Sequence, residues 1–490
     1  MRWLTRMLGD KGKAETGAGK PAPLFFTNTL SGAKEVFVPL KAGAASMYSC
    51  GPTMYGPAHI GNLRAYVISD TIARTLTAAG YRVRRVINIT DFGHLVSDGD
   101  EGEDKMTKGL RRDGLALTLE NMRAMAERYT AGFVRDLAAI GIDTEEVLFP
   151  RASDFIPEEI ALIRTLEQKG YAYRTSDGVY FDVSRFAGYG RLGGLDLANQ
   201  QAGARVAQHK EKRNAADFVL WKSDGKLGWQ SPWGLGFPGW HIECSAMIRS
   251  LLGQEIDVHT GGEDLIAVHH NNEIAQSEAA NGRPFVRYWM HNAFLTMGGE
   301  KASKSVGNVV YLSDVSEKGF HPLALRYLFL QAHYRTPLSF SWDALAAAAS
   351  ALDRLWRLSA DIARESKRSG EPSEARDRFL AMVRDDISTP QALGILWDSL
   401  RSEDYTPEEK YGLLEAADKH LGLSLTRPPI TAPIPGAQAP EDLRNLLDER
   451  SAARARKDFA AADRIRADIE RRGYRVDDGP EGPMLTPTTL

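Results

Sequence analysis

The strongest constraint on the fold is an alternation of strand-like and helix-like segments near the N-terminus. Residues 45–50 are strand-like and stop at Gly51-Pro52, residues 63–79 have a helical pattern closed by Gly80, and residues 81–90 form a second strand rich in Val and Ile. A strand, a helix and a strand within about 45 residues predict a βαβ unit and a parallel sheet. Ligands bind beyond the carboxyl ends of the strands in such sheets, so the loops there are the first place to expect a site.

After residue 112 the alternation stops and later resumes, which divides the 490 residues into several units. At about 150 residues per domain, the length predicts roughly three domains. Residues 113–235 combine helical patterns, hairpin-like strands and a Gly-rich polar stretch, and we interpret them as an inserted module. The α/β pattern resumes at Pro238. Nearly all of 322–421 is helical in pattern, and a Pro-rich linker over 427–440 leads to one last predicted helix over 443–472.

The composition is that of a globular protein, with 43% hydrophobic and 26% charged residues. No run approaches the ~20 apolar residues that span a bilayer, which excludes an integral membrane protein and predicts no membrane partner. Two cysteines are too few for a disulfide framework and favour a reducing, cytoplasmic location. Residues 1–21 lack the apolar core of a secretory signal. We interpret them as a flexible extension, with a transit peptide or surface anchor as the alternative.

The net charge of −3 argues against a histone-like mode of nucleic-acid binding but leaves room for a local basic patch. Between residues 450 and 475 nine basic residues stand against four acidic ones, on and just past the last predicted helix. The bases are Arg450, Arg454, Arg456, Lys457, Arg464, Arg466, Arg471, Arg472 and Arg475. A solvated charged helix is the ordinary interpretation of such a run, and RNA binding is the alternative.

Four potential metal ligands lie in three separate stretches. Cys50 ends a strand, Cys244 lies near a predicted helix start, and His269 and Glu273 are four residues apart, so their side chains share one face of a helix. Two thiolates, an imidazole and a carboxylate together suit zinc. Lone buried cysteines usually serve as small core residues, so spacing alone leaves both interpretations open.

Two further stretches have features of phosphate-binding loops. His59 and Asn62, with a Gly between them, lie between a strand and a helix, where the helix N-terminus offers free N–H groups. Lys301 and Lys304 follow a Gly pair and could neutralise a polyphosphate. Short Lys/Ser stretches are usually solvated loops, so neither motif decides the function alone.

Taken together and in order, these motifs resemble those of cysteinyl-tRNA synthetases, a class I aminoacyl-tRNA synthetase family. The resemblance covers roughly residues 23–480. It rests on the stretches CGPTMYGPAHIGNLR, NITDFGH, DFVLWK, SPWGLGFPGWHIECSAM, DVHTGGEDLIAVHHNNEIAQSE, KASKSVGN and ERSAARARKDFAAADRIR.

The resemblance implies roles for individual residues. Cys50, Cys244, His269 and Glu273 would be the ligands of one zinc ion. His59 and Asn62 would be the ends of the HIGH-type signature, and Lys301 and Lys304 the lysines of the KMSKS-type loop; these four would be catalytic and bind ATP with Mg²⁺. The pocket for the substrate cysteine would be lined by Trp240, His259, Thr90 and Asp264. The adenosine of ATP would contact Gly261, Gly262 and Asp264.

The sequence departs from the family pattern at several positions. Asn62 replaces the last His of the HIGH form, Ala302 replaces Met in the KMSKS form, and Asn271 stands where Glu is usual. None of these changes removes a proposed ligand or cation. The family's terminal Trp motif is absent near Met484, which weakens inference about anticodon contacts.

The implied activity is the ATP-dependent formation of cysteinyl-adenylate and transfer of cysteine to the 3′ end of tRNA(Cys), by a chain expected to be a monomer. Two alternatives are a ligase that joins activated cysteine to a small amine and a non-catalytic RNA- or zinc-binding paralogue.

The expected architecture is a Rossmann-like α/β catalytic domain with an insertion, followed by helical and RNA-binding domains. In chain order the predicted units are a flexible extension (1–21), the first catalytic half (22–112), the connective module (113–235), the second catalytic half (236–312) with the KMSKS-type loop before a stem-contact region (313–350), a helical bundle (351–426), a linker (427–440) and an anticodon-binding domain (441–490).

Overall fold

In the computed structural model, the described residues are 23–92, 105–194, 211–298, 300–301, 309–429, 434–472, 474–479 and 482–487. Their centre is a parallel sheet in the order β12-β11-β3-β4-β5, with every neighbouring pair parallel. The strands are β3 (Ala44–Ser49), β4 (Arg82–Ile87), β5 (Val147–Leu148), β11 (Ile256–Gly262) and β12 (Val286–Asn292). The predicted Rossmann-like fold is therefore confirmed.

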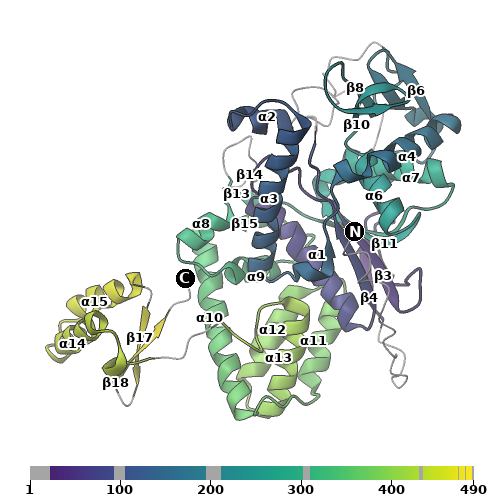
Figure 1. Cartoon of the computed structure of the whole chain (residues 1–490). Helices are drawn as coiled ribbons and strands as arrows, with labels where there is room; N and C mark the ends of the chain where they lie inside the picture. The colour runs from purple at the N-terminus through teal and green to yellow at the C-terminus, as the bar shows by residue number, and fades with distance from the viewer. Residues whose placement is uncertain are drawn as a thin grey trace.

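The predicted βαβ unit consists of β3, α1 (Ile60–Ala78) and β4. His59 caps the start of α1 with its side chain, and one side of the helix buries residues such as Ile60, Leu63, Val67 and Leu76 against the sheet. Such burial of an apolar face supplies most of a helix's stability in a protein. The second half of the sheet adds α6 (Ile242–Leu251) and α7 (Asn271–Asn281) (Figure 1).

Between the two halves of the sheet the chain forms its own α/β layer. An antiparallel sheet in the order β6-β7-β8-β10-β9 lies beside α4 at the top of Figure 1. Its elements, with the helices that precede them, are α2 (Lys105–Arg112), α3 (Leu119–Ala139), α4 (Ile156–Gln168), β6 (Ala172–Thr175), β7 (Gly178–Phe181), β8 (Phe218–Ser223), β9 (Trp229–Ser231) and β10 (Gly234–Pro238). Within the predicted module 113–235, β5 belongs to the parallel sheet, and the antiparallel layer forms only after it. The domain boundaries stay predictions.

The remainder of the chain is mostly helical and packs below the parallel sheet (Figure 1). It comprises α8 (Leu312–Glu317), α9 (Pro322–Leu330), α10 (Trp342–Glu365), α11 (Glu374–Arg384), α12 (Thr389–Arg401) and α13 (Pro407–Leu421). Small sheets complete the fold: β1 (Phe25–Asn28) with β2 (Ala33–Val36), and β13 (Leu295–Met297) with β14 (Glu300–Lys301) and β15 (Leu338–Phe340). One hydrophobic core continues from the catalytic sheet into the helices.

The prediction of one helix over 443–472 is wrong. The structure has two helices, α14 (Glu441–Ala455) and α15 (Phe459–Arg471), which pack with β16 (Ile434–Pro435), β17 (Tyr474–Gly479) and β18 (Gly482–Pro487). Lys457 has a left-handed φ of 62°, which stops the first helix, and the Asp458 carboxylate accepts a hydrogen bond from the Ala461 N–H at 3.0 Å, which caps the second. Among the described residues, no helix is long and apolar enough to cross a membrane.

Candidate metal centre and nucleotide site

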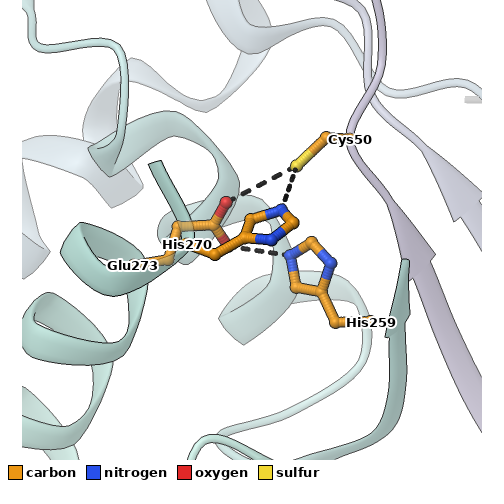
Figure 2. A group of neighbouring side chains, drawn as sticks. All are labelled: Cys50, His259, His270 and Glu273. Atoms are coloured by element: carbon orange, nitrogen blue, oxygen red, sulfur yellow. Dashed lines mark hydrogen bonds and ion pairs between the residues drawn. The ribbon is translucent and has the colours of Figure 1, made fainter. Parts of the chain in front are cut away.

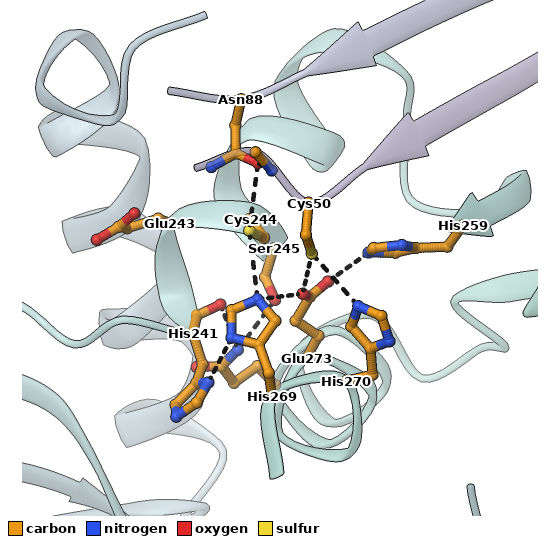
Figure 3. Close-up of polar contacts among 12 residues, drawn as sticks. Cys50, Asn88, His241, Glu243, Cys244, Ser245, His259, His269, His270 and Glu273 are labelled. Atoms are coloured by element: carbon orange, nitrogen blue, oxygen red, sulfur yellow. Dashed lines mark hydrogen bonds and ion pairs between the residues drawn. The ribbon is translucent and has the colours of Figure 1, made fainter. Parts of the chain in front are cut away.

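The predicted metal ligands meet beyond the carboxyl ends of the parallel strands. Cys50 directly follows β3, and Cys244 lies in the first turn of α6. His269 lies just before α7, and Glu273 lies in its first turn. Figure 3 shows their side chains pointing toward one another. Gly51 makes room for this loop, since a Cβ there would lie 1.5 Å from the Asn88 carbonyl oxygen. The fold thus brings together residues more than 200 positions apart.

The four donor atoms lie close enough to share one ion. Cys50 Sγ is 3.5 Å from Glu273 Oε1, Cys244 Sγ is 3.6 Å from His269 Nε2, and His269 Nε2 is 2.8 Å from Glu273 Oε1. All four atoms lie within 4.8 Å of one another. A tetrahedral zinc with its usual bond lengths separates its ligand atoms by about 3.3–3.8 Å. The two sulfur distances already match this range, and the nitrogen–oxygen pair would have to open by roughly half an ångström.

The ionisation of these groups also suits a cation. Burial favours the neutral form of Glu273, but its interactions with the rings of His259 and His269 hold the pKa of its carboxyl down at about 2. Burial likewise disfavours the charged form of His269, yet the Glu273 carboxylate raises its pKa to about 10. A hydrogen bond from Cys50 lowers the pKa of the Cys244 thiol to about 6. A divalent ion would therefore find a carboxylate and a thiolate, and it would displace the proton of His269.

A second set of donors overlaps the first. Cys50 Sγ lies 3.3 Å from His270 Nε2, and His259 Nε2 lies 2.9 Å from Glu273 Oε2 (Figure 2). Cys50, His259, His270 and Glu273 therefore also form a possible metal-binding group. The family resemblance places His259 in the amino-acid pocket. In the structure its ring stacks on Trp289, with the ring centroids 4.6 Å apart.

Several histidines that received no role from the sequence support these ligands. His241 Nδ1 and His269 Nδ1 are 2.9 Å apart, and His270 Nδ1 lies 2.7 Å from His291 Nε2. Such hydrogen bonds to the far ring nitrogen fix the tautomer and orientation of a ligand. Burial lowers the pKa of His270 and His291, so both rings are neutral. The GWHIEC and VHHNNE stretches contain His241, His269 and His270, and His291 lies in β12, but sequence spacing does not show which of these rings touch.

The HIGH-type segment forms the cap of α1. His59 Nδ1 accepts hydrogen bonds from the backbone N–H groups of Gly61 at 3.1 Å and Asn62 at 3.3 Å, and the Asn62 side-chain oxygen accepts from the His59 N–H at 3.2 Å. Because Nδ1 is an acceptor, the ring proton lies on Nε2. The chain that follows the KMSKS-type loop pairs with this cap, since the Ile60 N–H donates to the Val310 carbonyl at 2.9 Å. Residue 310 is therefore adjacent to the start of α1.

The glycine motif at the end of β11 comes into close contact with other groups. A Cβ on Gly261 would lie 2.7 Å from His270 Cε1, and one on Gly262 would lie 2.3 Å from Asp264 Oδ1. Only glycine fits at either position without movement of these neighbours.

The remaining residues predicted to contact substrates are Thr90, Trp240, Lys301 and Lys304. Thr90 Oγ1 donates to Glu243 Oε2 at 2.8 Å. The Trp240 ring lies 4.5 Å from that of His269, with Lys105 Nζ 5.5 Å from its centroid. Lys301 lies in β14. Lys304 lies outside the described residues.

Comparison with known proteins identifies the family of the chain. Residues 36–350 match the family described as the tRNA synthetases class I (C) catalytic domain. The cysteine–tRNA ligase 1 of Burkholderia lata is 48% identical, over 94% of this chain and 97% of that protein. The cysteine–tRNA ligase of Chlorobium chlorochromatii is 41% identical, over 93% and 98%.

Among solved structures, the methionyl-tRNA synthetase of Mycobacterium tuberculosis in complex with methionyl-adenylate shares the fold, with a TM-score of 0.54 at 18% identity and coverage of 86% of this chain and 96% of that one. The fold class expected from the βαβ pattern therefore agrees with this neighbour. The identity and coverage of the curated relatives show that the chain belongs to the cysteine–tRNA ligase family of class I aminoacyl-tRNA synthetases.

Proposed function

We propose that the chain activates L-cysteine with ATP and transfers it to tRNA(Cys), with zinc at Cys50, Cys244, His269 and Glu273. The observation that carries this proposal is the convergence of two thiols, an imidazole and a carboxylate within 4.8 Å at the ligand-binding edge of the sheet. A zinc ion held there would supply a preference for the substrate thiolate over the hydroxyl of serine. A hydrophobic pocket discriminates between such close analogues by only about 100-fold.

The first step would join a carboxylate oxygen of cysteine to the α-phosphorus of ATP and break the bond to the diphosphate, which leaves. Negative charge grows on the phosphate oxygens during this step. His59 would donate a hydrogen bond from Nε2, which carries the ring proton because Nδ1 accepts from the backbone. Lys301 and Lys304 would neutralise the diphosphate, with Asn62 at the same helix start and Mg²⁺ carried by the nucleotide.

The remaining pocket residues would position the amino acid and the nucleotide. We assign Trp240, His259, Thr90 and Asp264 to the cysteine side, and Gly261, Gly262 and Asp264 to the adenosine side. Support comes from the narrow space at Gly261 and Gly262, where a flat base or ribose could meet bare backbone. In the second step a terminal ribose hydroxyl of the tRNA attacks the carbonyl carbon and AMP leaves. That step depends mainly on the placement of the acceptor end.

The C-terminal domain is the proposed contact for the anticodon arm. Most of its basic residues form ion pairs, for example Arg450 and Arg454 with Asp478 and Arg472 with Asp442. Arg456, Lys457 and Arg464 are exposed and form no ion pair with a described residue. Beside them Phe459 is 63% exposed. An exposed aromatic ring among unpaired cations suits a stacked RNA base next to its phosphates.

The test pairs cysteine-dependent ATP–diphosphate exchange with a metal assay on the purified chain. Cys244→Ser should lose bound zinc and cysteine activation while the chain stays folded, because serine keeps the shape but is a poor zinc ligand. Ser245→Ala is the matched control, since it removes a neighbouring buried hydroxyl that bonds to Gln276 and leaves the four donors in place. Full exchange activity with normal metal content in Cys244→Ser would contradict the ligand assignment.

The same preparation separates the alternatives. Exchange without charging of tRNA(Cys) would favour a ligase acting on a small amine, and zinc binding without exchange would favour a non-catalytic paralogue. We also propose that the chain acts as a monomer in the cytoplasm. Sedimentation of the purified protein checks the first of these statements.

A further inference from the structure

A cleft of about 880 Å³ lies between the catalytic sheet and the helical bundle, away from the candidate metal centre. Its walls come from the second half of α1, the start of β4, the turn around residues 143–146, and helices α11 and α13. The metal cluster lies at the opposite, carboxyl ends of the strands. The cleft is therefore a separate feature of the fold, and the steps proposed above do not use it.

Asp70, Arg74 and Arg85 line this cleft, and the buried Arg326 lies behind them on the same carboxylate. Asp70 is the only acid among four buried or half-buried groups: its carboxylate bonds to Arg74 Nε at 2.6 Å, Arg85 Nη1 at 2.8 Å and Arg326 Nη2 at 2.7 Å. Three guanidinium groups thus share one carboxylate. Buried charge without compensation is costly, so this arrangement favours binding of additional anionic charge.

One of these guanidinium groups is incompletely bonded. Arg74 and Arg326 donate further hydrogen bonds to backbone carbonyls, those of Gly141 and Leu421 among them. Arg85 Nη2 has no hydrogen-bond partner among the described residues, and Arg85 as a whole is only 7% exposed. Arg85 is also one of the residues that line the cleft. A buried donor without a partner marks a place for a missing acceptor.

The rim of the cleft adds three more cations. Arg376 and Arg384 from α11 and Lys419 from α13 line it, and none of them forms an ion pair with a described residue. Burial and the charges of Arg384, Lys419 and Arg74 lower the pKa of His420 to about 4, so that this lining residue is neutral. The acids Asp143, Glu146 and Glu415 also line the cleft, but the five lining bases outnumber the four lining acids.

We propose that this cleft binds a small anion that bears a phosphate group. The cleft presents the guanidinium groups of Arg74, Arg85, Arg376 and Arg384 and the ammonium of Lys419. Guanidinium groups bind phosphate oxygens through paired hydrogen bonds. The recessed position of Arg85 favours a small molecule over the backbone of an RNA, which would contact the rim alone. The ligand would bridge β4 and α1 of the catalytic part to α11 and α13 of the bundle.

The experiment titrates the full-length protein with inorganic phosphate at constant ionic strength and follows the thermal unfolding midpoint. A ligand that binds only the folded state raises this midpoint as its concentration exceeds its Kd. Arg376→Ala/Arg384→Ala should weaken the apparent Kd about tenfold or more, since each charged hydrogen bond contributes on that order. Thr77→Trp, which places a ring in the cleft without changing its charge, should have the same effect.

Arg378→Ala is the matched control because it removes an exposed base from the same helix outside the cleft. Each variant should retain cysteine-dependent ATP–diphosphate exchange. Retained exchange shows that the variant is folded and that its nucleotide site is intact, so that any phosphate bound at the nucleotide site is the same in all variants. A phosphate response of the double variant equal to that of Arg378→Ala would overturn the proposal. An unchanged phosphate response with weaker tRNA binding would also overturn it and would make the rim an RNA contact. If the chain fails to charge tRNA(Cys), the phosphate titration still tests the cleft, because it measures thermal unfolding and not charging.

Discussion

Glu159 on α4 allows a direct test of the electrostatic environment next to the candidate metal centre. It lies on α4 with 0% of its surface exposed, and neither carboxyl oxygen has a hydrogen-bond partner among the described residues. Burial, and next to it the negative charges of Glu243 and Asp91, raise the pKa of Glu159 well above the ordinary value. The residue is therefore protonated in the folded protein at a pH where the unfolded chain has already lost the proton.

The sign of the pH effect follows from this difference. A carboxyl whose pKa is raised by folding stabilises the protein fully only below its unfolded pKa, and that stability is lost as the pH rises through the folded pKa. Between the two values the free energy of unfolding falls by about 1.4 kcal/mol per pH unit for this one proton. Glu159→Gln keeps the shape of the side chain but cannot ionise. The variant should therefore not lose this part of the free energy of unfolding as the pH rises.

The assay compares denaturant midpoints of wild type and Glu159→Gln at several pH values from 5 to 8, in chelator-treated protein. The variant should gain stability relative to wild type as the pH rises, and saturation with zinc should reduce that gain, because a nearby dication favours ionised carboxylates. Glu158→Gln is the matched control on the same helix, exposed to solvent. Parallel pH profiles for wild type and Glu159→Gln would refute the reasoning, since they would mean that the carboxyl is already ionised or solvated.

Two further predictions concern the metal ligands and the C-terminal domain. His241→Phe should weaken zinc binding about 10–100-fold, because the 2.9 Å contact that orients His269 is lost; competition with a chromogenic chelator measures it, and an unchanged affinity would exclude that orienting role. Truncation after Pro440 should reduce charging of tRNA(Cys) far more than ATP–diphosphate exchange, because it removes the unpaired cations Arg456, Lys457 and Arg464. Equal losses in the two assays would contradict this division of labour.

The sequence predicts the metal cluster because its ligands are tied to the ends of regular elements. Cys50 follows a strand, and Cys244 and Glu273 lie in the first turns of helices, so the topology of a parallel sheet already places them at one edge. Resemblance to a family then selects this set over the structural alternative for lone cysteines. The roles of His241 and His291 could not be predicted, since their hydrogen bonds join residues whose proximity depends on the packing of α6, α7 and β12.

The wrong prediction near the C-terminus has a local cause. Apolar periodicity and helix-forming residues continue through 455–459, so the pattern shows no break. The break arises because Lys457 takes a left-handed backbone and Asp458 caps the next helix, which lets α14 and α15 fold against each other. Glu159 is a second feature that the sequence analysis did not predict. Helical spacing places Glu159 on the apolar face with Ile156 and Ile163 and leaves Glu158 off it, but a carboxyl on that face could not be predicted to lack hydrogen-bond partners.

The local backbone before α7 explains why two donor sets share the same pair of ligands. Residues Ile266–His270 form a π-helical turn, whereas the sequence analysis places His269 and Glu273 together on one ordinary helix. Consecutive histidines leave this turn toward different sulfurs, His269 toward Cys244 at 3.6 Å and His270 toward Cys50 at 3.3 Å.

Donor chemistry decides between the two sets. Both sets contain Cys50 and Glu273; the set with His269 adds a second thiol and one imidazole, whereas the other adds two imidazoles, so the first is softer and more negative once its thiols ionise. Soft thiolate donors favour zinc and reduce its strength as a Lewis acid, which suits recognition of a substrate sulfur better than activation of water. We therefore expect Cys244→Ser to remove zinc from the protein, and His270→Ala to leave much of it bound.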